Sequence, residues 1–337
     1  MTTPTVFPSA KRFLSLAKET VQGTAVTPAT YTEPVTDFKP KDDPVLLEDR
    51  ALRGSMGGLY GVVQGPRKST FDLSGPMFLT GLPHWLLNIM GEIATTGPVS
   101  SIYTHAITLL NSGTGQPPSH TLIDWQGPTT TRARTYAGSC LSEMTLKGNP
   151  ESTLVEWSGK GSGFWSQAYP TSEPTPVGLP TIGPTAAWRM ELAVGGVLPA
   201  AANVTIREWE LTITRKLAVQ HTSRNSQDPY VIQRGDLDIT GKFYFAKPST
   251  EEALDYLRNN TQPQLQFKLS NGAAGALAQT LQIDIQAAAF DMVEINRGDE
   301  AVGYDSTWRA INNTTNVGAS GGHGPAKFTI TNAVATY

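Results

Sequence analysis

The chain has a single cysteine, Cys140, and therefore cannot form an internal disulfide. Its cysteine content gives no reason to expect an oxidising compartment. Long apolar runs are also missing, since no stretch approaches the roughly 18 apolar residues of a membrane helix. The first residues lack the basic start and apolar core of a signal peptide. We expect a chain that is made in the cytoplasm and has no membrane partner.

Charged residues are scarce as well. Asp, Glu, Lys and Arg make up 16% of the chain, against roughly 25% in typical globular proteins. The net charge is −3, and Lys and Arg gather only in pairs such as Lys11-Arg12 and Arg67-Lys68. Aromatic residues, 8% of the chain, are dispersed and are not set beside basic runs. These features argue against a protein that grips nucleic acid through a basic, base-stacking surface.

Turns and alternating strands are what the sequence has in quantity. The chain contains 32 glycines and 24 prolines, as turn-rich β proteins require. Segments such as WRMELAVGG, REWELTITRKLAV and PQLQFKLSN alternate apolar and polar residues, which predicts half-buried strands. LPHWLLNIMG (82–91) and STEEALDYLRNN (249–260) predict two short helices. Little charge and many turns together predict a mainly β protein whose surface is covered by copies of itself.

Composition divides the chain into four parts. Residues 1–44 are rich in proline and threonine and predict an extended arm that needs a body or a neighbour to become ordered. Residues 45–165 form a first β region and residues 188–337 a second one. Residues 166–187 carry five prolines and predict a semi-rigid linker.

The two β regions resemble each other. FDLSG (71–75) is followed by a strand end and a helix, and so is LDITG (237–241). After each helix comes a strand, YTHAITLLN (103–111) or PQLQFKLSN (263–271), and then a long hairpin. The repeated order predicts two tandem β-sandwich or barrel repeats, each with one short helix. Two unrelated β domains would also alternate, and this alternative stays open.

Motifs for chemistry are missing. The five histidines lack the spacing of a zinc site. GKGSGF (159–164) lacks the Gly-Lys-Ser/Thr ending of a phosphate loop, and no G-x-S-x-G nucleophile elbow is present. Asp284, Asp291 and Glu294 could form a glycosidase pair, but alternation puts most of them on the polar faces of strands. We therefore predict no catalytic, cofactor-binding or metal site, no cofactor and no enzymatic activity.

A short N-terminal motif carries a resemblance to a known family. Lys18, Glu19 and Thr20, followed by Gly23 and Thr24, match a Lys-Glu-Thr-x-x-Gly-Thr stretch near the start of siphophage major tail tube proteins. VLLEDRALRGS (45–55) follows about twenty residues later, at a place where members of that family have a strand region. The late segment QTLQIDIQAAAFDMVEINRGDEAVGYDSTWRAI is similar to the family's closing hairpin and strand. The chain therefore resembles a tail tube protein of a long-tailed bacteriophage over most of its length.

The resemblance implies a β-sandwich whose inner sheets join across subunits into a barrel around a channel. Rings of such subunits stack into a tube through which the genome is delivered. Some members carry one sandwich and form hexamers, whereas others carry two and form trimers. The apparent duplication here predicts trimeric, pseudo-hexameric rings.

The resemblance also implies partners and a location. The partners are other copies of the chain and the tape measure, tail terminator and distal tail proteins, with phage DNA as passing cargo rather than a tight ligand. The location is the virion tail, assembled in the cytoplasm of the bacterial host.

Two sets of residues are candidates for contacts in such a tube. The apolar N-terminal segment is expected to contact a neighbouring subunit or ring through Phe13, Leu14, Leu16, Lys18, Glu19, Gly23 and Thr24. A channel that lets DNA slide should be neutral to negative, because each phosphate neutralised by Lys or Arg adds salt-dependent affinity. The candidate lumen-facing residues are Glu143, Glu156, Gln282, Asp284, Gln286, Asp291 and Glu294.

Two other functions are alternatives at this point. An extracellular carbohydrate-binding or hydrolytic β protein would need clustered exposed tryptophans and a carboxylate pair in one groove. The seven tryptophans here lie instead in strand or helix patterns. The inner tube of a contractile tail shares the fold, and one sequence does not separate it from a non-contractile tube.

Overall fold

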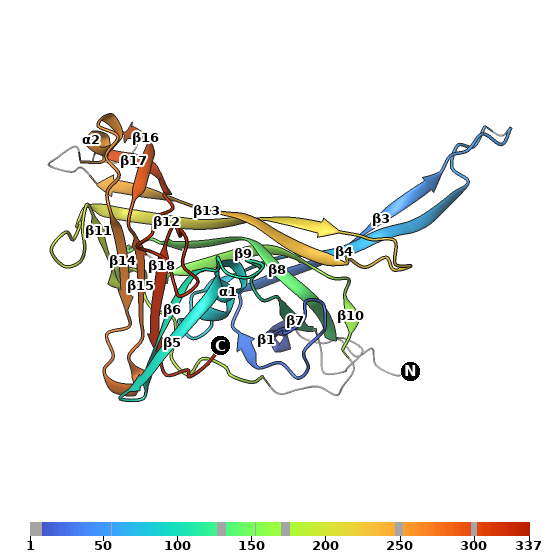
Figure 1. Ribbon diagram of the computed structural model, residues 1–337, viewed down its shortest axis with the longest axis horizontal. Helices are drawn as coiled ribbons and strands as arrows, with labels where there is room; N and C mark the ends of the chain where they lie inside the picture. Colours follow the sequence, from blue (N-terminus) through green and yellow to red (C-terminus); the bar gives the residue numbers. More distant parts are fainter. Residues whose placement is uncertain are drawn as a thin grey trace.

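The computed structural model describes residues 9–54, 56–126, 133–151, 153–169, 176–246, 252–297 and 302–337. Within these residues the chain forms an antiparallel sheet of twelve strands, another of six strands, and two short α-helices. Strands of the small sheet run across one face of the large one, so the chain folds as crossed layers (Figure 1). The mainly β fold with two helices that the sequence predicts is confirmed.

Eight strands of the large sheet lie side by side in the order β3, β4, β9, β8, β12, β13, β17 and β16. Their bounds are β3 (Asp37–Asp49), β4 (Gly61–Pro76), β8 (Ala133–Gly148), β9 (Glu156–Gly163), β12 (Ile206–Gln220), β13 (Val231–Ala246), β16 (Ala288–Asn296) and β17 (Gly303–Ala310). Buried and exposed residues alternate along them: in β13, Leu237 and Ile239 are buried, while Asp238 between them is exposed. One face of this eight-stranded part is therefore apolar and the other polar.

The other four strands of the large sheet are β1 (Phe13–Lys18), β2 (Tyr31–Glu33), β7 (His120–Trp125) and β10 (Gln167–Ala168). The long strand β8 connects them to the first eight strands. Its C-terminal half pairs with β9 and β12, and its N-terminal half pairs with β7 and β10. β1 lies between β7 and β2.

The small sheet covers the apolar face of the large one. Its strands, in spatial order, are β11 (Met190–Val194), β14 (Leu265–Ser270), β15 (Thr280–Ile285), β18 (Lys327–Asn332), β6 (Ile102–Leu109) and β5 (Gly91–Val99). The part of the chain that the structure describes also contains the 3-10 turns η1 (Ser9–Lys11), η3 (Ala187–Arg189) and η4 (Gly275–Leu277). Between the sheets, the ring of Phe267 lies 5.8 Å from that of Phe243 and 6.2 Å from that of Trp308. Such aromatic contacts, together with burial of apolar surface, stabilise the core between the two sheets.

Both predicted helices are present. α1 (Leu82–Met90) is buried along its whole length, with Pro83 in its first turn. It ends at Gly91, whose φ of 101° is easily reached only without a Cβ. α2 (Glu252–Arg258) packs on β16, where Tyr256 stacks on Phe290 at 5.8 Å between ring centroids. Residues 249–251 of the predicted second helix lie outside the described residues.

The two β regions of the sequence share the same pair of layers. β8 of the first region pairs with β12 of the second, and β6 pairs with β18. Residue 44, where the arm was expected to end, lies inside β3. Of the predicted linker, residues 166–168 are close to or within β10, and residues 170–175 lie outside the described residues.

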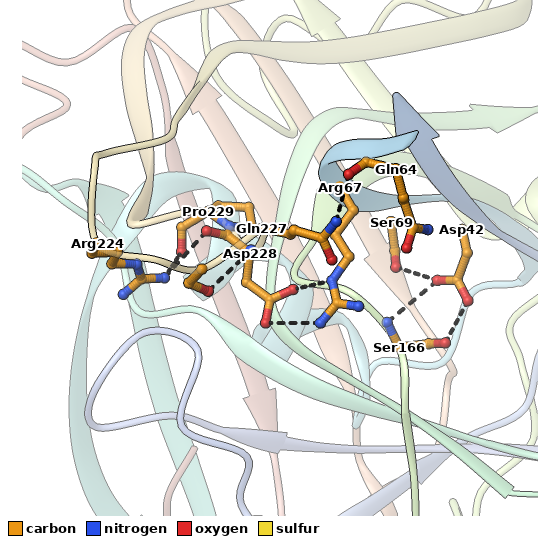
Figure 2. A network of polar contacts seen from close by, with 10 residues as sticks. Asp42, Gln64, Arg67, Ser69, Ser166, Arg224, Gln227, Asp228 and Pro229 are labelled. Atoms are coloured by element: carbon orange, nitrogen blue, oxygen red, sulfur yellow. Dashed lines mark hydrogen bonds and ion pairs between the residues drawn. The ribbon is translucent and has the colours of Figure 1, made fainter. Parts of the chain in front are cut away.

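β3 and β4 form a long hairpin that extends away from the body (Figure 1). Figure 2 shows how the loop between β12 and β13 holds the base of this hairpin. Arg67 Nε donates to Asp228 Oδ1 at 2.7 Å, and Gln227 Nε2 donates to the carbonyl of Gln64 at 2.7 Å. Beside this contact, Ser69 Oγ donates to Asp42 Oδ1 at 2.6 Å. The base is therefore fixed, and the part beyond it projects freely from the single chain.

Candidate functional site

The candidate site is the exposed face of the eight strands from β3 to β16, here called the polar face. Its side chains alternate with the buried ones of the same strands. The charged members of its central part are Asp37, Lys39, Asp72, Glu143, Lys147, Glu156, Lys160, Glu208, Glu210, Asp238, Lys242, Asp291, Glu294, Asp305 and Arg309. Ten of these are carboxylates and five are cations, so the face carries an excess of negative charge at neutral pH.

The cations of this set are each paired with a carboxylate. Lys160 lies opposite Glu143 with Nζ 2.8 Å from Oε1, and Lys147 lies opposite Glu156 at 3.1 Å. Ion pairs of the same kind join Lys242 to Glu210 (3.4 Å), Arg309 to Asp291 (2.7 Å) and Lys39 to Asp37. The hydrogen bond and the charge of Glu143 raise the pKa of Lys160. Lys160 is therefore charged, and its ammonium group is bound to Glu143. The positive charges in the central part of the polar face are therefore neutralised locally, by a direct neighbour on the sheet.

A row of hydroxyl groups crosses the centre of the polar face. Ser74, Ser158, Thr145, Thr212 and Thr240 are successive cross-strand partners from β4 to β13. Thr145 Oγ1 and Thr212 Oγ1 are hydrogen-bonded to each other at 3.0 Å. These hydroxyl groups are neutral, so they can bind water but do not attract an ion.

At one end of the polar face the surface is hollowed. The residues that line this hollow include Lys147, Glu156, Glu208, Glu210, Lys242, Tyr244, Met292, Glu294, Asp305 and Thr307. Five of these are carboxylates and two are lysines, and both lysines belong to the ion pairs described above. The hollow is thus the most acidic part of the face and is unsuited to binding a phosphate.

The structure divides the predicted lumen-facing residues into two groups. Glu143, Glu156, Asp291 and Glu294 lie on the polar face. Gln282 and Asp284 lie on β15, in the small sheet, and Gln286 lies between β15 and β16. The sequence predicted one hairpin for all of the second-region members, whereas the chain passes from one sheet to the other between Ile285 and Ala288. The two groups therefore belong to different layers and do not face the same side.

The predicted arm residues pack largely within their own chain. Leu14 and Leu16 are fully buried in β1, because β7 and β2 flank this strand. Glu19 is also buried, and its carboxylate accepts hydrogen bonds from Ser119 Oγ (2.6 Å) and Thr121 Oγ1 (2.7 Å). It accepts two more from the backbone N–H groups of residues 138 (2.8 Å) and 23 (3.0 Å).

These buried side chains are unavailable to a neighbouring subunit. The motif Lys18–Thr24 thus has an internal role that the sequence did not indicate, in which Glu19 ties its own segment to β7 and β8. Among the residues expected to contact a neighbour, Lys18 and Thr24 remain at the surface, and Phe13 and Gly23 are half-buried. Contact through these four stays a prediction.

The sequence missed an exposed apolar surface on the β3–β4 hairpin. Beyond its base, the hairpin exposes Val45, Leu46, Leu47, Leu52, Met56, Leu59, Val62 and Val63. Leu46 and Val63 are 60% and 65% exposed, although both lie in strands. An apolar two-stranded ribbon of this length is unusual on the surface of a chain that works alone. The sequence predicted a strand over VLLEDRALRG (45–54), but it did not indicate that the apolar side chains of this strand are exposed.

The described residues contain no group of three or more His, Cys, Asp or Glu side chains placed to hold a metal ion. Within the same residues, no helix has the length and apolar character to cross a membrane. Cys140 is fully buried, and burial raises the pKa of its thiol to about 11.

Comparison with known proteins gives one finding. The family model for phage tail tube proteins matches residues 9–310 of the chain. No curated protein matches it. The matched range includes all eight strands of the polar face, both helices and the β3–β4 hairpin.

Proposed function

The chain belongs to the phage tail tube protein family, and from this premise we propose that it is the major tail tube subunit of a long-tailed, non-contractile phage. In this proposal copies of the chain close into rings, the rings stack into a tube, and the genome leaves through the channel. The polar face lines that channel. The family is one of structural virion proteins, and the proposed role needs no catalysis.

The observation that carries the proposal is the neutralisation of the five cations in the central part of the polar face. DNA binds proteins mainly through Lys and Arg contacts to phosphates, and each such contact strengthens the hold. These five cations are paired with carboxylates, further carboxylates are added, and hydroxyls fill the centre. Toward the ends of the face Lys41 and Lys216 also have carboxylate partners, and Lys68 has none among the described residues. A surface of this kind repels the DNA backbone weakly and keeps a layer of water, so DNA slides past it.

The small sheet faces the opposite way and suits the outside of a tube. Its half-buried residues include Thr104, Ala106, Thr280, Thr329 and Thr331, which pair across β6, β18 and β15. Charged residues on this surface lie opposite residues of the other sign, Glu191 opposite Lys268 and Asp284 opposite Lys327, and the surface has no cluster of exposed aromatic residues among the described residues. In this proposal the large sheet lines the channel and the small sheet forms the outer wall.

The β3–β4 hairpin supports stacking of rings. Its apolar side chains would lie in water in an isolated subunit, at a cost of about 25 cal/mol for each Å² left exposed. Because its base is fixed by Arg67 and Asp228, the hairpin is held at a defined angle to the body. We propose that it inserts against a subunit of the adjacent ring.

Two experiments test this function. Electron microscopy of the purified chain should show hollow tubes of uniform width. Antibodies against the chain should decorate phage tails along their whole length, on tails that lack a sheath. Failure to form tubes under any condition, together with labelling confined to a tail end, would refute the proposal. A sheath around the labelled tube would instead assign the chain to a contractile tail.

A further inference from the structure

Four buried polar side chains lie together beneath the start of α1 and are here called the His84 cluster. Tyr31 Oη, Thr80 Oγ1, His84 Nδ1 and His120 Nε2 are shielded from solvent, and none makes a hydrogen bond of normal geometry to another described residue. They come from β2, the turn before α1, α1 itself and β7. A buried polar atom without a partner costs free energy, so the occurrence of four in one place calls for an explanation.

Ring contacts show that the members of the cluster are neighbours. The ring of His84 lies 5.0 Å from that of Tyr31 and 6.1 Å from that of His120, measured between centroids. Burial raises the pKa of Tyr31, and the hydroxyl of Thr80 is close enough to act against this rise. His84 is therefore in the middle of the cluster, with a hydroxyl group on one side and an imidazole on the other.

The carboxyl group of Glu33 borders the cluster. Gly81, before the first residue of α1, has no side chain, and a Cβ there would lie 2.7 Å from Tyr31 Oη and 2.2 Å from Glu33 Oε2. Both oxygens therefore face the backbone of Gly81. The same oxygen of Glu33 accepts a hydrogen bond from Trp85 Nε1 at 3.0 Å. The surroundings of the cluster are thus polar on the side of β2.

The hydrogen bonds of Asn88 define which nitrogen of His120 carries a proton. Asn88 Oδ1 accepts from the backbone N–H of Leu141 at 2.7 Å, which fixes the orientation of the amide. Asn88 Nδ2 therefore donates to His120 Nδ1, at 2.8 Å. Burial lowers the pKa of His120 well below its usual value, so the ring is neutral and its single N–H is on Nε2. This N–H is a buried donor that needs an acceptor.

The other members of the cluster can both donate and accept. The hydroxyls of Tyr31 and Thr80 each have one hydrogen and free lone pairs. Burial lowers the pKa of His84 to about 3, so this ring is also neutral at pH 7. A cation is a poor match for such a site, because His120 presents a donor and the charge of Lys18 acts on both histidines. A small neutral molecule with donors and acceptors fits best.

We propose that ordered water binds within the His84 cluster and bridges its four side chains. A buried water makes about three hydrogen bonds, typically to polar groups that lack another partner. Water bound here connects β2, α1 and β7, which lie far apart in the sequence. It therefore anchors the N-terminal strands to the helix through polar as well as apolar contacts. The proposed function does not depend on this water.

A direct hydrogen bond beside the cluster provides a reference for a test. The ring of Tyr337 lies 4.9 Å from that of His84 and 4.8 Å from that of His105. Its hydroxyl accepts a hydrogen bond from Asn332 Nδ2 at 2.6 Å. Tyr337→Phe therefore removes one directly bonded hydroxyl from the same region, and it should lower the urea midpoint of unfolding.

The sign of the stability change distinguishes a hydrated cluster from a dry one. Tyr31→Phe and Thr80→Val remove one hydroxyl each and keep the shape of the side chain. If water bridges these hydroxyls, each variant should lower the urea midpoint, as Tyr337→Phe does. Because the two hydroxyls share the same water, the double variant should lose less than the two single losses together. In a dry cluster the same changes remove unpaired polar groups, and the midpoint should stay or rise.

Thr135→Val is the matched control. The hydroxyl of Thr135 is also buried without a partner, but it lies on β8 opposite Ile123, outside the cluster. Its replacement should leave the urea midpoint unchanged or raise it. Equal losses in Thr80→Val and Thr135→Val would overturn the proposal, because the loss would then follow from replacing any buried hydroxyl.

A density map of the full-length chain, at a resolution that shows ordered water, tests the site directly. The expected result is a separate peak of density within hydrogen-bond distance of His120 Nε2 and of at least one further member of the cluster. A map that shows ordered water elsewhere in the protein interior but none in the His84 cluster would overturn the proposal. So would a rise of the urea midpoint in both Tyr31→Phe and Thr80→Val.

Discussion

Lys160 on β9 lies directly opposite Glu143 on β8, with its Nζ 2.8 Å from Glu143 Oε1. Both side chains are exposed, so the pair adds only about 0.2–1 kcal/mol to the free energy of unfolding. Its effect is on what the surface can bind, because a lysine held by a neighbouring carboxylate has little attraction left for a phosphate. Lys147 and Glu156 repeat the arrangement four residues away along both β8 and β9.

We predict that removing these two carboxylates turns a passive surface into one that holds DNA. The double variant Glu143→Gln, Glu156→Gln frees Lys160 and Lys147 without changing side-chain size. Tubes of the parent chain should bind duplex DNA weakly at low salt. Tubes of the variant should bind it more tightly, and the slope of log affinity against log salt should steepen by about 1–2.

Glu191→Gln is the matched control for this experiment. Glu191 is an exposed carboxylate on β11 of the small sheet, away from the polar face. Glu191→Gln should leave DNA binding unchanged in a tube whose channel is lined by the polar face. Equal tightening by the control and the double variant would mean that overall charge, not the polar face, governs the affinity.

The second prediction concerns stability at Glu19. Replacing this buried carboxylate by alanine leaves four donors, two of them backbone N–H groups, without their acceptor. We expect Glu19→Ala to lower the free energy of unfolding by more than about 3 kcal/mol. Urea denaturation measures the change, and Thr20→Ala, at the exposed neighbouring position, should cost less than about 0.5 kcal/mol. Similar costs for both variants would show that the network around Glu19 is unimportant.

The third prediction is a decline in stability between pH 6.5 and 8. Burial raises the pKa of Glu33 to about 8, against an opposing hydrogen bond from Trp85 Nε1 at 3.0 Å. The folded state therefore keeps a proton that the unfolded chain releases near pH 4.5. The stability that this proton provides is present in acid and is lost as pH rises toward 8. Between pH 6.5 and 8 the loss should be roughly 1–2 kcal/mol.

Buried histidines act in the opposite direction at lower pH. Burial lowers the pKa of His84 to about 3, and it lowers those of His105 and His120. The free energy of unfolding that they contribute grows as pH rises to about 6.5, the ordinary histidine pKa. Above pH 6.5, Glu33 is the group whose titration changes the stability. Glu33→Gln keeps an acceptor for Trp85 and should abolish the decline between pH 6.5 and 8. An unchanged decline in this variant, measured by urea titration, would assign it to another group.

The fourth prediction is that Cys140 is dispensable and unreactive. Its thiol is buried, lies 3.1 Å from the carbonyl of Gly138 and receives a hydrogen bond from Gln22 Nε2 at 3.3 Å. Cys140→Ser should assemble normally and cost about 1 kcal/mol. In the folded parent chain iodoacetamide should label the thiol slowly, because burial raises its pKa to about 11. Rapid labelling of intact tubes would contradict this description of the site.

The fifth prediction separates folding from stacking. Leu46→Ser combined with Val63→Ser removes exposed apolar groups from the hairpin, so the free energy of unfolding of the subunit should stay within about 0.5 kcal/mol. Long tubes should be lost, with single rings or subunits left in sedimentation and electron microscopy. Val204→Ser, at a highly exposed position outside the hairpin, is the matched control. Full-length tubes from the hairpin variant would show that stacking uses another surface.

Local patterns in the sequence predicted the elements well. The alternation in REWELTITRKLAV predicts β12, and Pro83 with Gly91 predicts both ends of α1, because these signals depend on neighbouring residues alone. The phage tail tube resemblance, carried by Lys18–Thr24, is confirmed by the family match. The physical role of that motif was beyond the sequence, since the partners of Glu19 lie about one hundred residues away in the chain.

The sequence did not predict which of the two sheets each strand joins. Asp284 and Asp291 are seven residues apart and both lie on polar faces of strands, yet they belong to different sheets. Alternation reports which side of a strand is polar, and it does not report which sheet the strand joins. The exposure of the apolar hairpin was beyond the sequence for a related reason: Leu46 and Val63 are apolar like core residues, and they are exposed because no layer of the described residues covers them.

The central claim is that the polar face lines the channel, and a cryo-electron microscopy map of tubes assembled from the purified chain tests it most directly. The account predicts that the eight strands from β3 to β16 form the inner wall, with Glu143, Lys160, Thr145 and Thr212 pointing into the lumen. It also predicts three chains in each ring, with the small sheet on the outside. A map in which β15 and β18 of the small sheet line the channel would contradict the account.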